Sequence, residues 1–61
     1  MRTLAVLRNR LGLTQRGLAK LAKVSHVTIA RLETGQFDPR LSTLRQLAKV
    51  LKVKVRDLLD E

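Results

Sequence analysis

The side chains best suited to recognising another molecule lie on one short segment of the sequence. Residues 14–35, TQRGLAKLAKVSHVTIARLETG, show two stretches of helical spacing joined by a turn of three or four residues. The second helix can pack only one of its faces on the protein. Its other face carries an aliphatic group, a methyl group, a guanidinium and a hydroxyl, at Val27, Ala30, Arg31 and Thr34. This spacing predicts a partner outside the chain.

Size and composition exclude several classes of chemistry. Sixty-one residues form one small domain, residues 1–61, and a chain of this size buries only about 60% of the surface that its unfolded form exposes. The chain has no cysteine and a single histidine, His26. It also has no Ser-His-Asp set, no paired carboxylates and no glycine-rich phosphate loop. We therefore expect no enzyme, no metal site and no cofactor.

The charge favours a polyanionic partner. Thirteen Lys and Arg residues stand against five acids, and residues 1–32 contain seven basic residues and no acid. A merely solvated basic surface is the alternative, and charge alone does not name DNA. The longest apolar run, Leu4 to Leu7, is far too short to span a membrane. We expect a soluble cytoplasmic chain with no membrane contact and no small-molecule ligand.

Hydrophobic spacing predicts five short helices and no strand. The first covers about Thr3 to Leu11 and is closed by Gly12. The second starts at the N-cap Thr14, and the third starts at the N-cap Ser25 and ends at Gly35. Their expected inward residues are Leu4, Leu7 and Leu11, then Leu18, Ala19 and Ala22, then Ile29 and Leu32.

The second half of the chain continues the helical pattern after a loop from Gln36 to Arg40 that contains Pro39. A fourth helix starts at about Leu41, and a last short helix covers about Val55 to Asp60. Their expected inward residues are Leu44, Leu47, Ala48, Leu51 and Leu58. The predicted fold is all-α, a compact bundle of five helices without a second domain.

Two opposite charges fall on the apolar stripes of their helices. At about 100° per residue, Arg8 lies between Leu4 and Leu11, and Glu33 lies beside Ile29 and Leu32. An unpaired charge in such a place costs several kcal/mol, roughly 3 to 5 when one partner is removed. We therefore predict a buried ion pair between Arg8 and Glu33, which ties the first helix to the end of the third.

The residues from Leu7 to Leu59 resemble the lambda-repressor-like helix-turn-helix family of Cro, cI and XRE type. The landmarks are the LR of residues 7–8, the LTQ of residues 13–15, Leu18 with Ala19, the I-x-x-L-E-x-G of residues 29–35, Pro39, and the TLRQLAKVL of residues 43–51. The resemblance implies a five-helix DNA-binding domain with its helix-turn-helix at about residues 14–35. In this family the arginine and glutamate at these positions commonly form the pair inferred above.

The resemblance also implies which side chains contact DNA. The helix from about Ser25 to Thr34 would lie in the major groove. The base-contacting residues would be Ser25, His26, Val27 and Arg31, with Val27 suited to a thymine methyl and Arg31 to guanine or phosphate. Phosphate contacts would come from the start of the second helix and its surroundings, at Gln15, Arg16, Lys20, Thr34 and Arg40.

The chain departs from the family where glycine is usual. The turn before the third helix has Lys23, and the end of the fourth helix has Lys52. If both keep a positive φ, each lysine costs about 1 kcal/mol of strain; otherwise the turn has shifted. Arg40 and Lys54 replace the small polar residues usual at the starts of helices four and five, where a cation opposes the helix dipole.

The leading hypothesis is a sequence-specific transcription regulator, a repressor, that binds a pseudo-palindromic operator in double-stranded DNA as a homodimer. The apolar residues Val50, Val53, Val55 and Leu59 nominate the C-terminal third as the dimer surface. The alternative is a helix-turn-helix scaffold, antitoxin-like or adaptor-like, whose main partner is a protein and whose DNA affinity is non-specific. RNA binding is third, because Phe37 is the only aromatic side chain.

Overall fold

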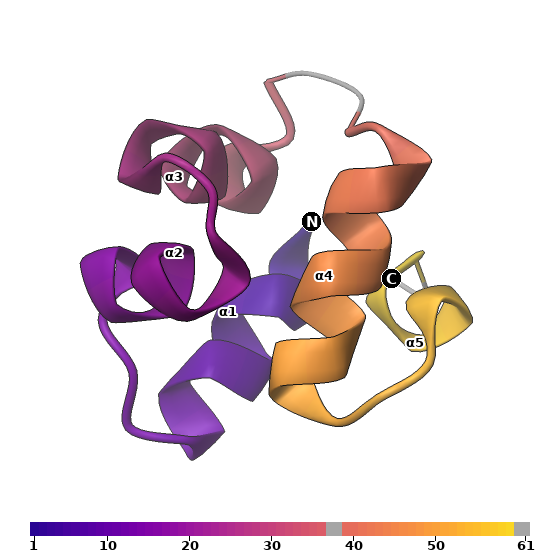
Figure 1. Cartoon of the computed structure of the whole chain (residues 1–61), viewed down its shortest axis with the longest axis horizontal. Helices are drawn as coiled ribbons and strands as arrows, with labels where there is room; N and C mark the ends of the chain where they lie inside the picture. Colours follow the sequence, from indigo (N-terminus) through magenta and orange to yellow (C-terminus); the bar gives the residue numbers. More distant parts are fainter. Residues whose placement is uncertain (37–38, 60–61) are drawn as a thin grey trace.

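Five α-helices and the turns between them make up the described part of the chain. The computed structural model describes residues 1–36 and 39–59. The helices are α1 (Arg2–Arg10), α2 (Gln15–Ala22), α3 (His26–Thr34), α4 (Leu41–Leu51) and α5 (Val55–Leu59) (Figure 1). These ranges contain no strand, and the predicted all-α architecture is confirmed.

Side-chain caps and a left-handed glycine fix the borders of the two central helices. Thr14 Oγ1 accepts a hydrogen bond from the backbone N–H of Gly17 at 2.9 Å, and Ser25 Oγ accepts one from Val27 at 3.1 Å. Helix α3 ends at Gly35, whose φ of +74° is free of strain only in glycine. The predicted caps and stop are confirmed.

The structure explains why a glycine stands at position 17, inside a helix. A Cβ added there would lie 3.2 Å from Thr14 Oγ1, the atom that caps α2. A side chain at this position would therefore press on the cap. The glycine trades helix propensity, about 1 kcal/mol relative to alanine, for an unobstructed N-terminus of α2.

The core lies where the apolar stripes of the five helices meet. Helix α3 packs against α1 and α2, α2 also packs against α4, and α5 packs against both α4 and α1. The inward faces of all five helices enclose a single cluster in a molecule of 21 × 20 × 19 Å. Its buried members are Leu4, Leu18, Ala19, Ala22, Ile29, Leu32, Leu44, Leu47, Ala48, Leu51 and Leu58.

Helix α1 corrects one expectation about the core. The helix ends at Arg10, and Leu11 leaves it with a φ of −87° and a ψ of 1°. Leu11 is 51% exposed, so the prediction that it belongs to the buried stripe was wrong. At the other end of the chain, Asp60, the expected last residue of α5, lies outside the described residues.

Both lysines at family glycine positions keep the left-handed conformation. Lys23 ends α2 and Lys52 ends α4, each with a φ of 59°. The turn before α3 has therefore not shifted, and each lysine bears strain of about 1 kcal/mol. The two unusual helix starts differ: Arg40 gives α4 no side-chain cap, whereas Asp57 reaches back and accepts from the Lys54 N–H at 3.0 Å.

Candidate nucleic-acid interface

The four predicted base-contacting residues are all exposed: three lie at the N-terminal cap and first turn of α3, and Arg31 lies in its last turn. Ser25, His26, Val27 and Arg31 are exposed, and the exposed fraction of Val27 is 44%. The opposite side of the helix is held in the core by Ile29 and Leu32, which are fully buried. Because Ile29 and Leu32 anchor the inner face of α3 in the core, the outer face of the helix is held toward solvent.

The hydroxyl groups at the two ends of α3 differ in what they can still donate. Ser25 Oγ accepts from Val27, so its own hydrogen is available to a partner. Thr34 Oγ1 donates back to the carbonyl oxygens of Ala30 and Arg31, at 3.2 and 3.1 Å. To donate to a phosphate, Thr34 would have to give up this intrahelical bond.

The start of α2 presents backbone donors and two aligned cations. The Thr14 cap takes the N–H of Gly17, which leaves the first two amides of the helix, those of Gln15 and Arg16, pointing out of its N-terminus. The side chains of Arg16 and Lys20 are exposed and four residues apart, so they share one face. This helix end suits an anion, because charge and backbone donors coincide.

The structure gives the Gln15 side chain an additional partner inside the protein. Gln15 is half-buried, and its Nε2 donates to Glu33 Oε1 at 3.0 Å. The amide nitrogen carries a second hydrogen that remains for an outside acceptor. The sequence holds no signal for this contact, because its two residues are 18 positions apart.

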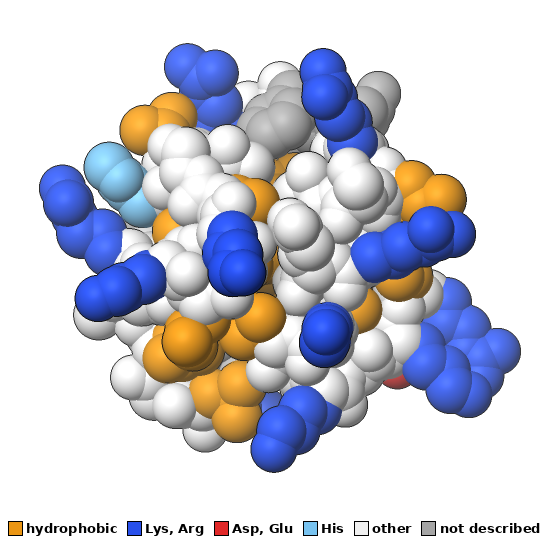
Figure 2. Space-filling view, in the orientation of Figure 1, with side chains coloured by type: hydrophobic (Ala, Val, Ile, Leu, Met, Phe, Trp, Pro, Cys, Tyr) orange, Lys and Arg blue, Asp and Glu red, His pale blue; other side chains and the backbone are white. Residues whose placement is uncertain are grey.

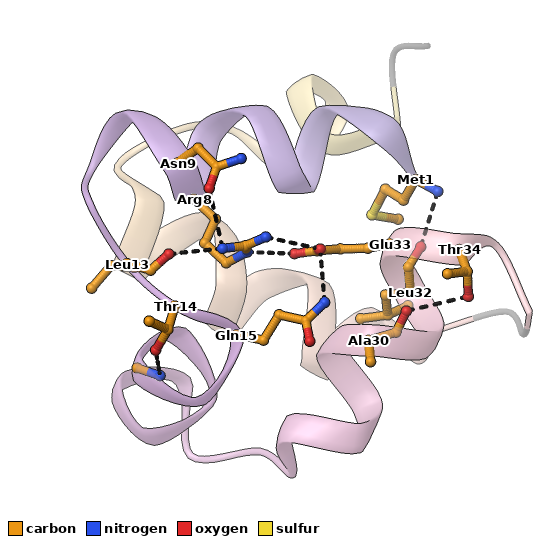
Figure 3. Close-up of polar contacts among 11 residues, drawn as sticks. Met1, Arg8, Asn9, Leu13, Thr14, Gln15, Ala30, Leu32, Glu33 and Thr34 are labelled. Carbon is orange, nitrogen blue, oxygen red and sulfur yellow. Dashed lines mark hydrogen bonds and ion pairs between the residues drawn. The ribbon is translucent and has the colours of Figure 1, made fainter.

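Arg8 and Glu33 meet as a two-point ion pair (Figure 3). Arg8 Nε lies 2.6 Å from Glu33 Oε2, and Arg8 Nη2 lies 3.1 Å from Oε1. The remaining guanidinium nitrogen donates to the carbonyl oxygen of Leu13 at 2.8 Å and to Asn9 Oδ1 at 3.2 Å. The pair thus joins α1, the segment before α2 and the last turn of α3.

The ion pair is less buried than the sequence predicts. Its side chains retain 13% and 9% of their exposure, so one edge of the pair meets solvent. Met1 adds a second tie between α1 and α3, because its nitrogen donates to the carbonyl oxygen of Leu32 at 2.9 Å. Together with the hydrogen bond from Gln15, these contacts tie α3 to both α1 and α2.

Hydrogen bonding outweighs desolvation at the Glu33 carboxyl. Partial burial raises the pKa of Glu33, but the hydrogen bonds from Arg8 and Gln15 and the charge of Arg8 lower it more, and the net pKa lies below its ordinary value. The same hydrogen bond raises the pKa of Arg8. Both groups are therefore charged across the physiological pH range.

No carboxylate competes with an anion on the outside of the first three helices. Glu33 is the only acid in residues 1–36, and it points inward to Arg8. Figure 2 shows basic side chains distributed over one whole face of the molecule, with hardly any acidic surface. Arg40, at the start of α4, is exposed and extends the positive surface beyond the end of α3.

A model of the helix-turn-helix family matches residues 4–58, which include every described helix in whole or in part. An HTH-type transcriptional regulator of Methanocaldococcus jannaschii is 44% identical over 46 residues, 75% of this chain and 70% of that protein. The HTH-type transcriptional regulator DicA of Escherichia coli is 44% identical over 45 residues, 74% of this chain and 33% of DicA.

The HTH-type transcriptional regulator PuuR of Escherichia coli is 33% identical over 58 residues, 95% of this chain and 31% of PuuR. The chain thus spans about a third of the length of DicA and PuuR. No solved structure matches the chain at the significance that these relatives reach. The family match over residues 4–58 and the regulators among its relatives identify this chain as a DNA-binding regulator domain and not an enzyme. The chain belongs to the lambda-repressor-like helix-turn-helix family.

Proposed function

We propose that this chain binds a specific sequence of double-stranded DNA through α3, and that it represses transcription as a homodimer on a pseudo-palindromic operator. One observation carries the proposal: the outer face of α3 is exposed and flanked by cations, its inner face is anchored in the core, and the one acid of the first three helices is turned inward. The major groove of DNA is bordered by negatively charged phosphates, so it attracts a helix face that is flanked by cations and free of acids.

Each exposed residue of α3 has a role that fits its chemistry. Val27 offers apolar surface to a thymine methyl, and Arg31 can fork onto guanine O6 and N7 or hold a phosphate. His26 offers a single hydrogen bond to a base edge or a phosphate, and Ser25 still has its hydroxyl hydrogen to donate. Sequence preference in this proposal rests mainly on Val27 and Arg31.

The phosphate contacts in the proposal centre on the N-terminus of α2. The backbone amides of Gln15 and Arg16 point out of the helix end, where the helix dipole attracts an anion. Arg16, Lys20 and Arg40 add charge, and Gln15 contributes the amide hydrogen that Glu33 does not use. Thr34 ranks below these residues as a phosphate contact, because its hydroxyl hydrogen already bonds within α3.

The proposed dimer surface lies in the C-terminal third of the chain. Leu59 is 57% exposed at the end of α5, whereas Val50, Val53 and Val55 are half-buried against the core. Leu59 is therefore the member of the predicted patch with most surface left to cover. Two copies would place two α3 helices about 34 Å apart on one side of the duplex, one helical turn. The proposal includes a cytoplasmic location.

Selection of bound duplexes from a random pool, at about 150 mM salt, tests the proposal. We expect enrichment of an inverted repeat with fixed spacing between half-sites. The variant Leu59→Ser should keep the half-site but lose the repeat. If no sequence is enriched and binding vanishes as salt rises, the chain is a non-specific DNA binder, and the protein-interaction alternative replaces this proposal.

A further inference from the structure

A groove with an apolar floor and a basic rim lies between the end of α2 and the second half of α4. Its volume is about 390 Å³, and it is lined by Leu21, Ala22, Lys23, Gln46, Lys49 and Val50. Figure 2 faces this region and shows hydrophobic surface between basic side chains, where α2 lies beside α4 in Figure 1. None of these residues is among the proposed DNA contacts, and Val50 alone also belongs to the proposed dimer patch.

Leu21 is the feature of this groove that the fold does not explain. It is 56% exposed, although its neighbours Leu18 and Ala22 on the same helix are buried. On α4, Gln46, Lys49 and Val50 follow the i, i+3, i+4 spacing of one helix face. The apolar surface of α2 is thus wider than the part that α3 and α4 cover, and α4 borders the uncovered strip.

The rim of the groove lacks a negative partner among the described residues. Lys23 and Lys49 are exposed, and the described acids are engaged elsewhere: Glu33 with Arg8, and Asp57 with the N–H of Lys54. An occupant that places carboxylates near these two lysines would gain attraction without displacing an internal contact. A second copy of the chain is a poor match for these two lysines, because the chain has five acids against thirteen Lys and Arg and its described acids already make internal contacts.

The lining also indicates the size class of the occupant. Small-molecule sites contain a few buried polar groups that orient the ligand, but no polar or charged residue is buried among the described residues. The polar lining residues of this groove all stand at its exposed rim. Affinity would come instead from an apolar side chain set against Leu21 and Val50 with charges around it, as at a protein interface.

We propose that this groove docks an acidic segment of another protein, one that presents an aliphatic side chain flanked by aspartate or glutamate. The aliphatic group lies on Leu21, Ala22 and Val50, and the carboxylates face Lys23 and Lys49. The surface is separate from the exposed face of α3, so this chain can hold a protein partner through α2 and α4 and DNA through α3.

Display of short random peptides, selected on the full chain at about 150 mM salt, tests the proposal. A peptide from the enriched pool is then titrated into ¹⁵N-labelled chain. We expect enriched peptides to carry an aliphatic residue between acids, and the amide shifts to concentrate at residues 21–23 and 46–50. Leu21→Gln and Lys49→Glu should each weaken binding by at least about tenfold.

Matched variants separate this groove from general charge attraction. Leu11→Gln alters a leucine of similar exposure just after α1, and Arg45→Glu makes the same charge reversal one turn earlier on α4. Each should change peptide affinity by less than about twofold. Leu21 is exposed, so Leu21→Gln should also keep the circular dichroism spectrum and the DNA affinity of the unmodified chain.

Four results would overturn the proposal. The first is a selection without enrichment of acid-flanked aliphatic peptides. The second is equal weakening of peptide binding by Arg45→Glu and Lys49→Glu, which would mean diffuse charge attraction. The third is that a random DNA duplex shifts the amides of residues 21–23 and 46–50 as much as the peptide does. The fourth is self-association that Leu21→Gln abolishes in sedimentation, because the groove would then hold a second copy.

Discussion

Replacement of Glu33 by alanine tests whether the polar contacts of Figure 3 hold α1, α2 and α3 together. The change removes two hydrogen bonds from Arg8, at 2.6 and 3.1 Å, and one from Gln15, at 3.0 Å. It leaves the Arg8 guanidinium with the carbonyl oxygen of Leu13 and with Asn9 Oδ1. The arginine charge is therefore deprived of its counter-ion but not of every acceptor.

The partial burial of the pair sets the expected magnitude. Breaking a fully buried pair costs about 3 to 5 kcal/mol, whereas exposed pairs contribute roughly 0 to 1. Side chains that are 13% and 9% exposed stand nearer the first limit, but the two remaining acceptors of Arg8 reduce the loss. We expect Glu33→Ala to lower the free energy of unfolding by about 2 kcal/mol. In a domain of this size that lowers the Tm by roughly 10 °C.

Thermal and urea unfolding, followed by circular dichroism, measure this change in a double-mutant cycle. Arg8→Met keeps most of the aliphatic stem, and the double variant Arg8→Met with Glu33→Ala removes both charges. The double variant should be more stable than Glu33→Ala alone, because no unpaired guanidinium remains. A Tm of Glu33→Ala equal to that of the unmodified chain would falsify the role given to the pair.

Four further substitutions test the Glu33 carboxyl, the proposed DNA contacts and the left-handed residue that ends α4. Because the folded-state pKa of Glu33 is depressed, its contribution is complete above its ordinary pKa of 4.5 and is lost as the pH falls through the folded value; Glu33→Gln should flatten that part of a stability-against-pH curve. Arg31→Ala should weaken the preferred duplex by about 1 to 3 kcal/mol and relax the preference, while Arg16→Ala should weaken all duplexes alike. Lys52→Gly should raise the free energy of unfolding by up to about 1 kcal/mol, because it relieves a φ of 59°.

Each of these changes has its own control. The pH comparison uses the difference between the two curves, which cancels the other carboxyl groups; parallel curves would contradict the depressed pKa. For DNA, fluorescence anisotropy on matched and scrambled duplexes separates the two arginines, and an unchanged sequence preference in Arg31→Ala would remove it from base contact. Lys52→Ala makes the same charge change without relieving strain, so a gain in both variants would point to charge instead.

The borders of α2 and α3 were predictable because their signals are local. Thr14 and Ser25 precede apolar periods and cap the helices through bonds to amides two or three residues away. Gly35 ends α3 by a property of its own backbone. The positive φ of Lys23 and Lys52 could also be predicted, but only from the resemblance to a family that has glycine at these positions. Lysine itself does not indicate a left-handed conformation.

The prediction for Leu11 failed at a helix end, and other contacts could not be predicted because they depend on residues far apart in the sequence. Leu11 continues the apolar period of α1, yet the helix ends one residue before it and turns the side chain outward. The bond from Gln15 to Glu33 needs the packing of α2 on α3 before it exists. The exposure of Leu21 beside Lys49 likewise depends on how closely α2 and α4 approach, which periodicity within either helix does not fix.

The excess of positive charge makes folding and DNA binding respond to electrolytes in opposite directions. The chain carries a net charge of +8 within a molecule of 21 × 20 × 19 Å, so its folded state crowds like charges together. Added ions shield this repulsion and stabilise the fold, while they weaken attachment to phosphates. A nucleic acid supplies the same shielding from outside, so the domain is held most firmly in its folded form when it is bound.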